Sequence, residues 1–186
     1  IIGIISRTIT RNNKNFVGDY QNYLDKIYKV GGIPIIIKPY SYDSLNYLLS
    51  KCSGIIAPGG DEYDEYDKYI YEYCLNNDVP YLGICMGMQI MSDDLKKVSN
   101  HHNTSHIIYL NKNTKLYDIY QVEELMVNSR HKEAIKKTNL KISAISNDNI
   151  IEAIEVLDKK FIIGVEWHPE DLDDLKIFEY FIKNCI

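Results

Sequence analysis

The sequence lacks several features that would quickly assign it to a class of protein. It has no apolar run near the length of a membrane span, no secretory signal pattern and no basic cluster, and its net charge is −5. We therefore expect no membrane-spanning segment and no nucleic-acid partner.

Cysteine is also sparse, with four residues in a chain of 186. None of them forms a Cys-x-x-Cys pair, and scattered cysteines in a chain of this length are typical of a reducing compartment, so we expect a cytoplasmic protein. Cys52, Cys74 and Cys185 lie near the ends of helical patterns, and we interpret them as small buried or half-buried hydrophobic residues.

The length and composition are those of one ordinary globular domain. The chain is 45% hydrophobic and 25% charged, and it contains no repeat, no linker and no low-complexity segment. We therefore expect a single domain over residues 1–186, with a sizeable core.

The first half of the chain alternates between strand and helix patterns. Four short apolar runs, at residues 1–6, 33–37, 54–57 and 79–84, are separated by a polar loop at 7–15 and by helical spacings at 20–30, 44–52 and 64–77. This alternation predicts a parallel sheet with helices on both faces and an active site at the carboxyl ends of its strands.

The second half has a different pattern. After a helix at residues 86–91 and a polar, irregular stretch at 92–105, β-type runs occur at 107–110, 120–127, 140–145, 150–156 and 161–165, and a helix at 172–185 ends the chain. The spacing suits hairpins. We therefore predict a three-layer α/β fold whose mostly parallel central sheet carries a small antiparallel extension.

The chemistry begins at Cys85, which stands in a Gly-x-Cys-x-Gly motif at residues 83–87. A strand precedes it and a helix follows it, so it lies at a sharp turn where only very small neighbours fit. We expect strained backbone geometry, an exposed sulfur and a pKa lowered by the amides of the following helix. The alternative is a buried structural cysteine.

A histidine and a carboxylate follow the last predicted strand. His168 and Glu170, with Pro169 stiffening the connection, could complete a Cys-His-Glu triad with Cys85. His168 would accept the thiol proton, and Glu170 would hold the imidazole in the required tautomer. The alternative is a surface pair.

Three motifs together resemble the class I glutamine amidotransferase superfamily. They are residues 83–89 around Cys85, Pro58-Gly59-Gly60, and Trp167-His168-Pro169-Glu170, in this order along the chain. The resemblance covers essentially the whole chain. It implies a flavodoxin-like amidohydrolase domain that needs no cofactor, in which Cys85 attacks the γ-amide of a glutamyl group and a thioester forms.

The resemblance also implies supporting residues. Backbone N–H groups of Gly60 and Met86 would form the oxyanion hole, which agrees with the small size of Gly60 and with Met86 at a helix N-terminus. Gln89 would help to bind the glutamyl group. Its alternative role is a hydrogen bond to a nearby loop.

A finer resemblance points to the γ-glutamyl hydrolase-like branch, which includes γ-glutamyl-γ-aminobutyrate hydrolases. It rests on residues 127–131, 151–155 and 164–170. In that branch the Asn-Ser-x-His segment lines the glutamyl pocket. Ser129 and His131 are therefore candidate substrate contacts, with a structural role as the alternative.

Four departures from this branch leave the substrate open. Met86 stands where Arg is frequent, and Lys132 where a second His is usual. The segment 61–63 is shorter than the insertion common there, and residues 92–94 replace a glycine-rich loop. The walls that select the leaving group therefore differ, while the reaction type does not.

Two further groups of residues have weaker interpretations. His101, His102 and His106 suggest a metal site completed by Asp93 or Asp94, but the segment is loop-like and no further ligand pattern follows, so we expect no metal. The acidic, Tyr-rich residues 61–73 are interpreted as a solvated helix face rather than a docking surface.

Three functional hypotheses follow. The first is a hydrolase of a small γ-glutamyl conjugate, and the second is a glutaminase subunit that passes ammonia to a synthase partner. The third is a catalytically silent binding protein of the same fold, which the intact Cys85, His168 and Glu170 argue against. A homodimer is also compatible with the sequence.

Overall fold

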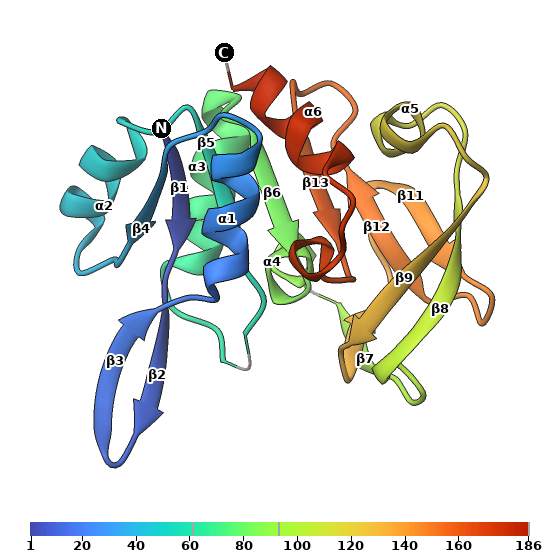
Figure 1. Ribbon diagram of the computed structural model, residues 1–186, viewed down its shortest axis with the longest axis horizontal. Coiled ribbons are helices and arrows are strands. Elements are labelled where there is room, and N and C mark those ends of the chain that lie inside the picture. Colours follow the sequence, from blue (N-terminus) through green and yellow to red (C-terminus); the bar gives the residue numbers. More distant parts are fainter. Residues whose placement is uncertain (61, 93, 186) are drawn as a thin grey trace.

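The computed structural model of the protein describes residues 1–60, 62–92 and 94–185. In this part of the chain, nine strands form one twisted sheet across the molecule (Figure 1). In spatial order they are β4 (Pro34–Ile37), β1 (Ile2–Ile5), β5 (Gly54–Ala57), β6 (Tyr81–Ile84), β13 (Ile162–Val165), β12 (Ile151–Glu155), β11 (Lys141–Ser146), β8 (His102–Leu110) and β9 (Glu124–Arg130).

The sheet is parallel on one side and antiparallel on the other, as the sequence predicts. Strands β4, β1, β5, β6 and β13 are parallel to one another, while β12, β11, β8 and β9 extend the sheet from β13 by antiparallel pairing. Strands β1, β5 and β6 are buried at every position, because parallel strands are covered on both faces.

Helices cover both faces of the sheet and complete three layers. One core contains side chains of α1 (Gln21–Lys29), α5 (Lys115–Tyr120) and α6 (Lys176–Asn184) packed on the sheet. A second core contains side chains of α2 (Tyr42–Leu49) and α3 (Asp67–Asn77), on the other face. The predicted three-layer α/β fold is therefore confirmed. No helix of the described residues is long and apolar enough to cross a membrane.

The predicted loop at residues 7–15 is wrong. Strands β2 (Arg7–Arg11) and β3 (Lys14–Gly18) form an antiparallel hairpin that projects beyond the end of the sheet (Figure 1). Asn12 and Asn13 both have positive φ, 51° and 57°, which matches the two-residue turn whose twist suits a hairpin. The hairpin is largely exposed, so its sequence shows no buried apolar face that would indicate strands.

The segment at 92–105 is also more regular than predicted. Strand β7 (Leu95–Lys97) pairs with β10 (Glu133–Ile135), and β8 begins at His102. The first half of β8 is mostly exposed and polar, so its backbone pairing with β9, rather than burial, makes it a strand. The β-type run predicted at 120–127 belongs to two elements. Helix α5, whose N-cap is the Thr114 side chain, ends at Tyr120, and strand β9 begins at Glu124.

Several predicted helix boundaries shift. Helix α3 starts at Asp67 rather than at residue 64, and α6 starts at Lys176, after a short 3-10 turn η1 (Pro169–Asp171). The solvated face predicted for residues 61–73 is partly wrong, because Asp67, Ile70 and Tyr71 are buried against the sheet. Asp61 and Asp93, which belonged to two of the predictions, lie outside the described residues.

Candidate active site

The three sequence motifs meet at the carboxyl ends of three neighbouring parallel strands. Pro58-Gly59-Gly60 follows β5, Cys85 follows β6, and Glu166 begins the segment after β13. The strands are aligned so that Ala57 pairs with Gly83, and Val165 pairs with Ile84. This is the sheet edge at which α/β proteins place their ligands.

Cys85 has the strained backbone that its motif predicts. Its φ is +53° and its ψ is −110°, which is unfavourable for a residue with a side chain. A Cβ at Gly83 would lie 2.4 Å from the Gly87 carbonyl oxygen, and a Cβ at Gly87 would lie 2.0 Å from the Ala57 carbonyl oxygen. Both flanking glycines are therefore required by close backbone contact.

The lowered pKa predicted for Cys85 is wrong for this structure. Burial, followed by the charge of Glu166, raises the pKa of the Cys85 thiol well above its usual value. The Met86 amide lowers it, but the helix behind it, α4 (Met86–Gln89), has only four residues and a correspondingly small dipole. The thiol therefore needs a base to remove its proton.

His168 is held in place by three polar contacts. Its Nδ1 lies 2.7 Å from Glu170 Oε1, and its backbone N–H donates to Asn128 Oδ1 at 2.8 Å. Asn128 Nδ2 also donates to the His168 carbonyl oxygen at 2.9 Å. The buried Glu170 carboxylate also pairs with Arg130, whose Nη2 is 3.3 Å away. The imidazole is thus fixed through both its ring and its backbone.

Gly59 brings the nucleophile and the histidine together. A Cβ built on Gly59 would lie 3.0 Å from His168 Cε1 and 3.4 Å from Cys85 Cβ. One built on Gly60 would lie 3.0 Å from Met86 Cε. Cys85 and His168 therefore lie against Gly59, and Met86 lies against the neighbouring Gly60.

Arg7 supports the loop that carries these glycines. Its Nη2 donates to the Pro58 carbonyl oxygen at 2.9 Å, and its Nη1 lies 2.8 Å from Asp67 Oδ1. A cavity of about 670 Å³ opens beside this loop, and Arg7, Asp19, Gly60 and Tyr63 contribute to its lining. This volume is in the range of small-molecule sites.

The predicted substrate contacts are engaged within the protein. Gln89 donates to the Glu133 carbonyl oxygen and to Glu166, and it accepts from Tyr63. Ser129 donates to the His101 carbonyl oxygen. His131 is buried. Of the two roles that the sequence left open for Ser129 and His131, these contacts support the structural one.

Of the metal ligands suggested by the sequence, His101 and His106 come together, with ring centroids 4.7 Å apart, but His102 and Asp94 do not join them. His102 is exposed and contacts the Arg130 carbonyl oxygen, while Asp94 lies 4.0 Å from Lys136. Instead, His101 meets His131 and Glu152, and within the described residues these three form the group whose side-chain atoms are close enough to share an ion.

Sequence reasoning missed several residues of the site. Asn128, Arg130 and Glu166 stand inside motifs that were recognised, but no pattern in the sequence assigns them a contact. Arg7 lies in a segment predicted to be a loop. Only the tertiary structure reveals that Arg7 reaches the glycine loop after β5.

Comparisons with known proteins place the chain in a family. The sequence model of the Peptidase C26 family matches residues 61–170, which contain Cys85, His168 and Glu170. A protein of Rickettsia prowazekii, named as glutamine amidotransferase-like, is 30% identical, and the alignment covers 88% of this chain and 87% of that protein.

Two further similarities involve CTP synthases. The CTP synthase of Lactobacillus delbrueckii subsp. bulgaricus is 27% identical over 70% of this chain, but the match spans only 33% of that enzyme. The solved glutaminase domain of Trypanosoma brucei CTPS, with bound acivicin, superposes with a TM-score of 0.79 at 16% identity, covering 99% of this chain and 92% of that domain.

Proposed function

Because the chain belongs to the Peptidase C26 family and is class I glutamine amidotransferase-like, we propose that it is a cysteine-dependent amidohydrolase of γ-glutamyl amides. The substrate would be glutamine or a small γ-glutamyl conjugate, and the products would be glutamate and ammonia or an amine. One observation carries the proposal: the strained Cys85 and the Glu170-bound His168 both lie against Gly59.

In the proposed reaction, His168 is the base that the half-buried Cys85 thiol requires. Its Nδ1–H donates to Glu170 Oε1, which leaves Nε2 free to take the proton of Cys85. The sulfur attacks the γ-carbonyl carbon, and the negative oxygen that forms accepts hydrogen bonds from the Gly60 and Met86 amides. Each such donor typically lowers the barrier by roughly 3–4 kcal/mol.

His168 then returns the proton to the leaving nitrogen, and the C–N bond breaks to leave a γ-glutamyl thioester on Cys85. A water molecule, deprotonated by the same imidazole, attacks the thioester and releases glutamate and the free thiol. The Glu170 carboxylate stabilises the imidazolium in both halves of the reaction. No step requires a cofactor.

Two versions of this activity differ in the leaving group. The motifs at residues 127–131 and 151–155 favour a stand-alone γ-glutamyl hydrolase. The similarity to CTP synthases supports the alternative, a glutaminase unit that supplies ammonia to a synthase partner.

The decisive experiment measures glutamate release by the purified chain from glutamine and from a panel of γ-glutamyl amines. A stand-alone hydrolase should turn over one conjugate well above glutamine. Slow glutamine hydrolysis, with no glutamate released from any conjugate, would favour the ammonia-supplying alternative.

A matched pair of cysteine variants tests the mechanism itself. Cys85→Ala should abolish turnover while the circular dichroism spectrum stays that of the wild type. Cys185→Ala, which removes another half-buried free thiol, should retain turnover. Activity that survives in Cys85→Ala would overturn the proposed reaction.

A further inference from the structure

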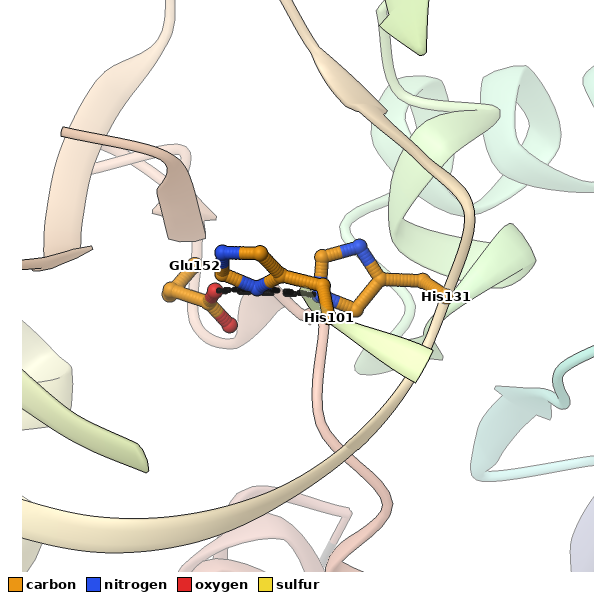
Figure 2. A group of neighbouring side chains, drawn as sticks. All are labelled: His101, His131 and Glu152. Carbon is orange, nitrogen blue, oxygen red and sulfur yellow. Dashed lines mark hydrogen bonds and ion pairs between the residues drawn. The ribbon is translucent and has the colours of Figure 1, made fainter. Parts of the chain in front are cut away.

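A second cluster of buried side chains is used by neither version of the proposed reaction. His101 lies just before β8, His131 just after β9, and Glu152 within β12, so three segments of the antiparallel half contribute. His101 and His131 are each 3% exposed, and Glu152 is 0% exposed. Figure 2 shows both imidazoles meeting the Glu152 carboxylate.

The outer nitrogen of each imidazole faces an acceptor. His101 Nε2 lies 3.0 Å from Asp148 Oδ2, and His131 Nδ1 lies 2.9 Å from the Glu133 carbonyl oxygen. Because a carboxylate and a carbonyl oxygen only accept hydrogen bonds, these outer nitrogens carry the ring hydrogens. The inner nitrogens, His101 Nδ1 and His131 Nε2, then present lone pairs.

The three inner atoms converge on one point. His101 Nδ1 is 3.2 Å from His131 Nε2 and 3.3 Å from Glu152 Oε1, and His131 Nε2 is 3.7 Å from the same oxygen. Two nitrogen lone pairs and a carboxylate oxygen repel one another in a buried site unless a proton or a metal cation lies between them. The second oxygen, Glu152 Oε2, is buried without a hydrogen-bond partner among the described residues.

We propose that His101 Nδ1, His131 Nε2 and Glu152 Oε1 bind a divalent transition-metal ion, with zinc as the best match. Zinc bonds of about 2.0–2.1 Å place the ligand atoms of a tetrahedron about 3.3–3.4 Å apart. The separations of 3.2, 3.3 and 3.7 Å fit this spacing. Two imidazoles and one carboxylate are also a familiar zinc ligand set.

The surroundings resemble those of metal-bound histidines. Such histidines almost always donate their outer N–H to a carboxylate or a backbone carbonyl, as His101 does to Asp148 and His131 to Glu133. His106 Nε2 lies 3.0 Å from Glu152 Oε1 and holds that carboxylate from outside the group of three, so water would fill the fourth corner.

The ion would have a structural role next to the active site. It would join the start of β8, the end of β9 and the middle of β12. His131 Nδ1 also lies 3.5 Å from Glu166 Oε1, and Glu166 accepts from Gln89 at the end of α4. Metal binding would therefore stabilise the packing behind the helix that follows Cys85, without taking part in the chemistry.

The test uses the full chain with Cys85→Ala, so that the active-site thiol cannot bind the metal. The protein is stripped with a chelator, and Zn²⁺ is titrated while the bound metal and the thermal midpoint are measured. We expect stoichiometric binding and a rise of the midpoint, because the ion binds the native state.

Two variants in the same background identify the site. Glu152→Gln preserves the shape but removes the charged ligand, and it should weaken zinc binding at least about 10-fold. His102→Asn is the matched control, since this neighbouring histidine is exposed and outside the cluster, and its affinity should equal that of the parent. Equal losses in both variants would overturn the proposal.

A measurement without variants covers the case in which Glu152→Gln fails to fold. Crystals of the protein with zinc, measured at the zinc absorption edge, should give an anomalous peak among His101, His131 and Glu152. A folded protein that binds no zinc, or a peak only elsewhere, means that these imidazoles share a proton instead of a metal and that the proposal is wrong.

Discussion

Two buried groups among the described residues each contain an imidazole that meets a carboxylate, and they differ in what lies in front of the ring. In the first, Glu170 fixes His168 Nδ1, and the ring and Cys85 both lie against Gly59. In the second, Asp148 fixes His101 Nε2, and the inner nitrogen faces His131 and Glu152.

The two groups show that the orientation of an imidazole and its chemical role are determined by different neighbours. A carboxylate behind the ring sets the tautomer in both places, so it does not determine what the free nitrogen does. A single thiol in front makes the nitrogen a base, whereas further lone pairs in front make it a ligand. Both proposed functions can be tested by changing only the group behind the ring.

Glu170→Gln should have the largest effect. An amide at this position cannot stabilise the imidazolium and permits the wrong tautomer, so kcat/KM for glutamate release should fall about 10³- to 10⁴-fold. Zinc affinity should not change, because Glu170 does not touch the second group. Asp173→Asn removes an exposed carboxylate three positions on and serves as the control.

Asn128→Ala should have the next largest effect. Asn128 holds the His168 backbone through two hydrogen bonds, of 2.8 and 2.9 Å, so its loss lets the imidazole drift from the thiol. We expect kcat to fall about 10- to 100-fold with little change of KM, because small displacements of catalytic groups have effects of this size. Asn111→Ala removes a comparable but distant contact to a carbonyl oxygen and should leave both constants unchanged. A rise of KM alone would show that Asn128 binds substrate instead.

The contrast between the two groups also explains what the sequence reveals. The Cys85 turn is predicted from adjacent residues, because a buried strand and two obligatory glycines are local features. His168 and Glu170 stand two positions apart and can be recognised together. Their catalytic roles stay predictions until the variants are measured.

The second group has no such local signal. His101 and His131 are 30 positions apart, and Glu152 follows on a different strand, so only the pairing of β8 with β9 and the neighbouring strands brings them together. The pKa of Cys85 was mispredicted for a related reason. Its local helix favours the thiolate, but burial by the tertiary fold has the larger effect and raises the pKa.

Asp148→Asn is the counterpart of Glu170→Gln in the second group. It weakens the acceptor behind His101 Nε2 without removing a proposed ligand, so zinc affinity should fall about 10- to 100-fold in the titration described above. Asp158→Asn, an exposed carboxylate outside the cluster, is the control. An unchanged affinity in Asp148→Asn would mean that the tautomer of His101 does not depend on Asp148.

The smallest effect should come from Asp19, a carboxylate in the cavity beside the first group. Burial, opposed by the Tyr20 amide and by Arg7, raises the pKa of Asp19 from 3.8 to about 7. The folded state therefore binds this proton more tightly than the unfolded state. The resulting stabilisation is complete below about pH 4 and is lost as the pH rises through about 7.

Asp19→Asn removes this dependence. At pH 8 the variant should be more stable than the wild type by about 1 kcal/mol, a value discounted because the carboxyl is only half-buried. At pH 5 the difference should shrink, since the wild-type carboxyl is then protonated. Thermal unfolding at the two pH values measures this, with the exposed Asp25→Asn as the control. Equal midpoint shifts at pH 5 and pH 8 would contradict the raised pKa of Asp19. They would mean that water reaches this carboxyl in the folded protein.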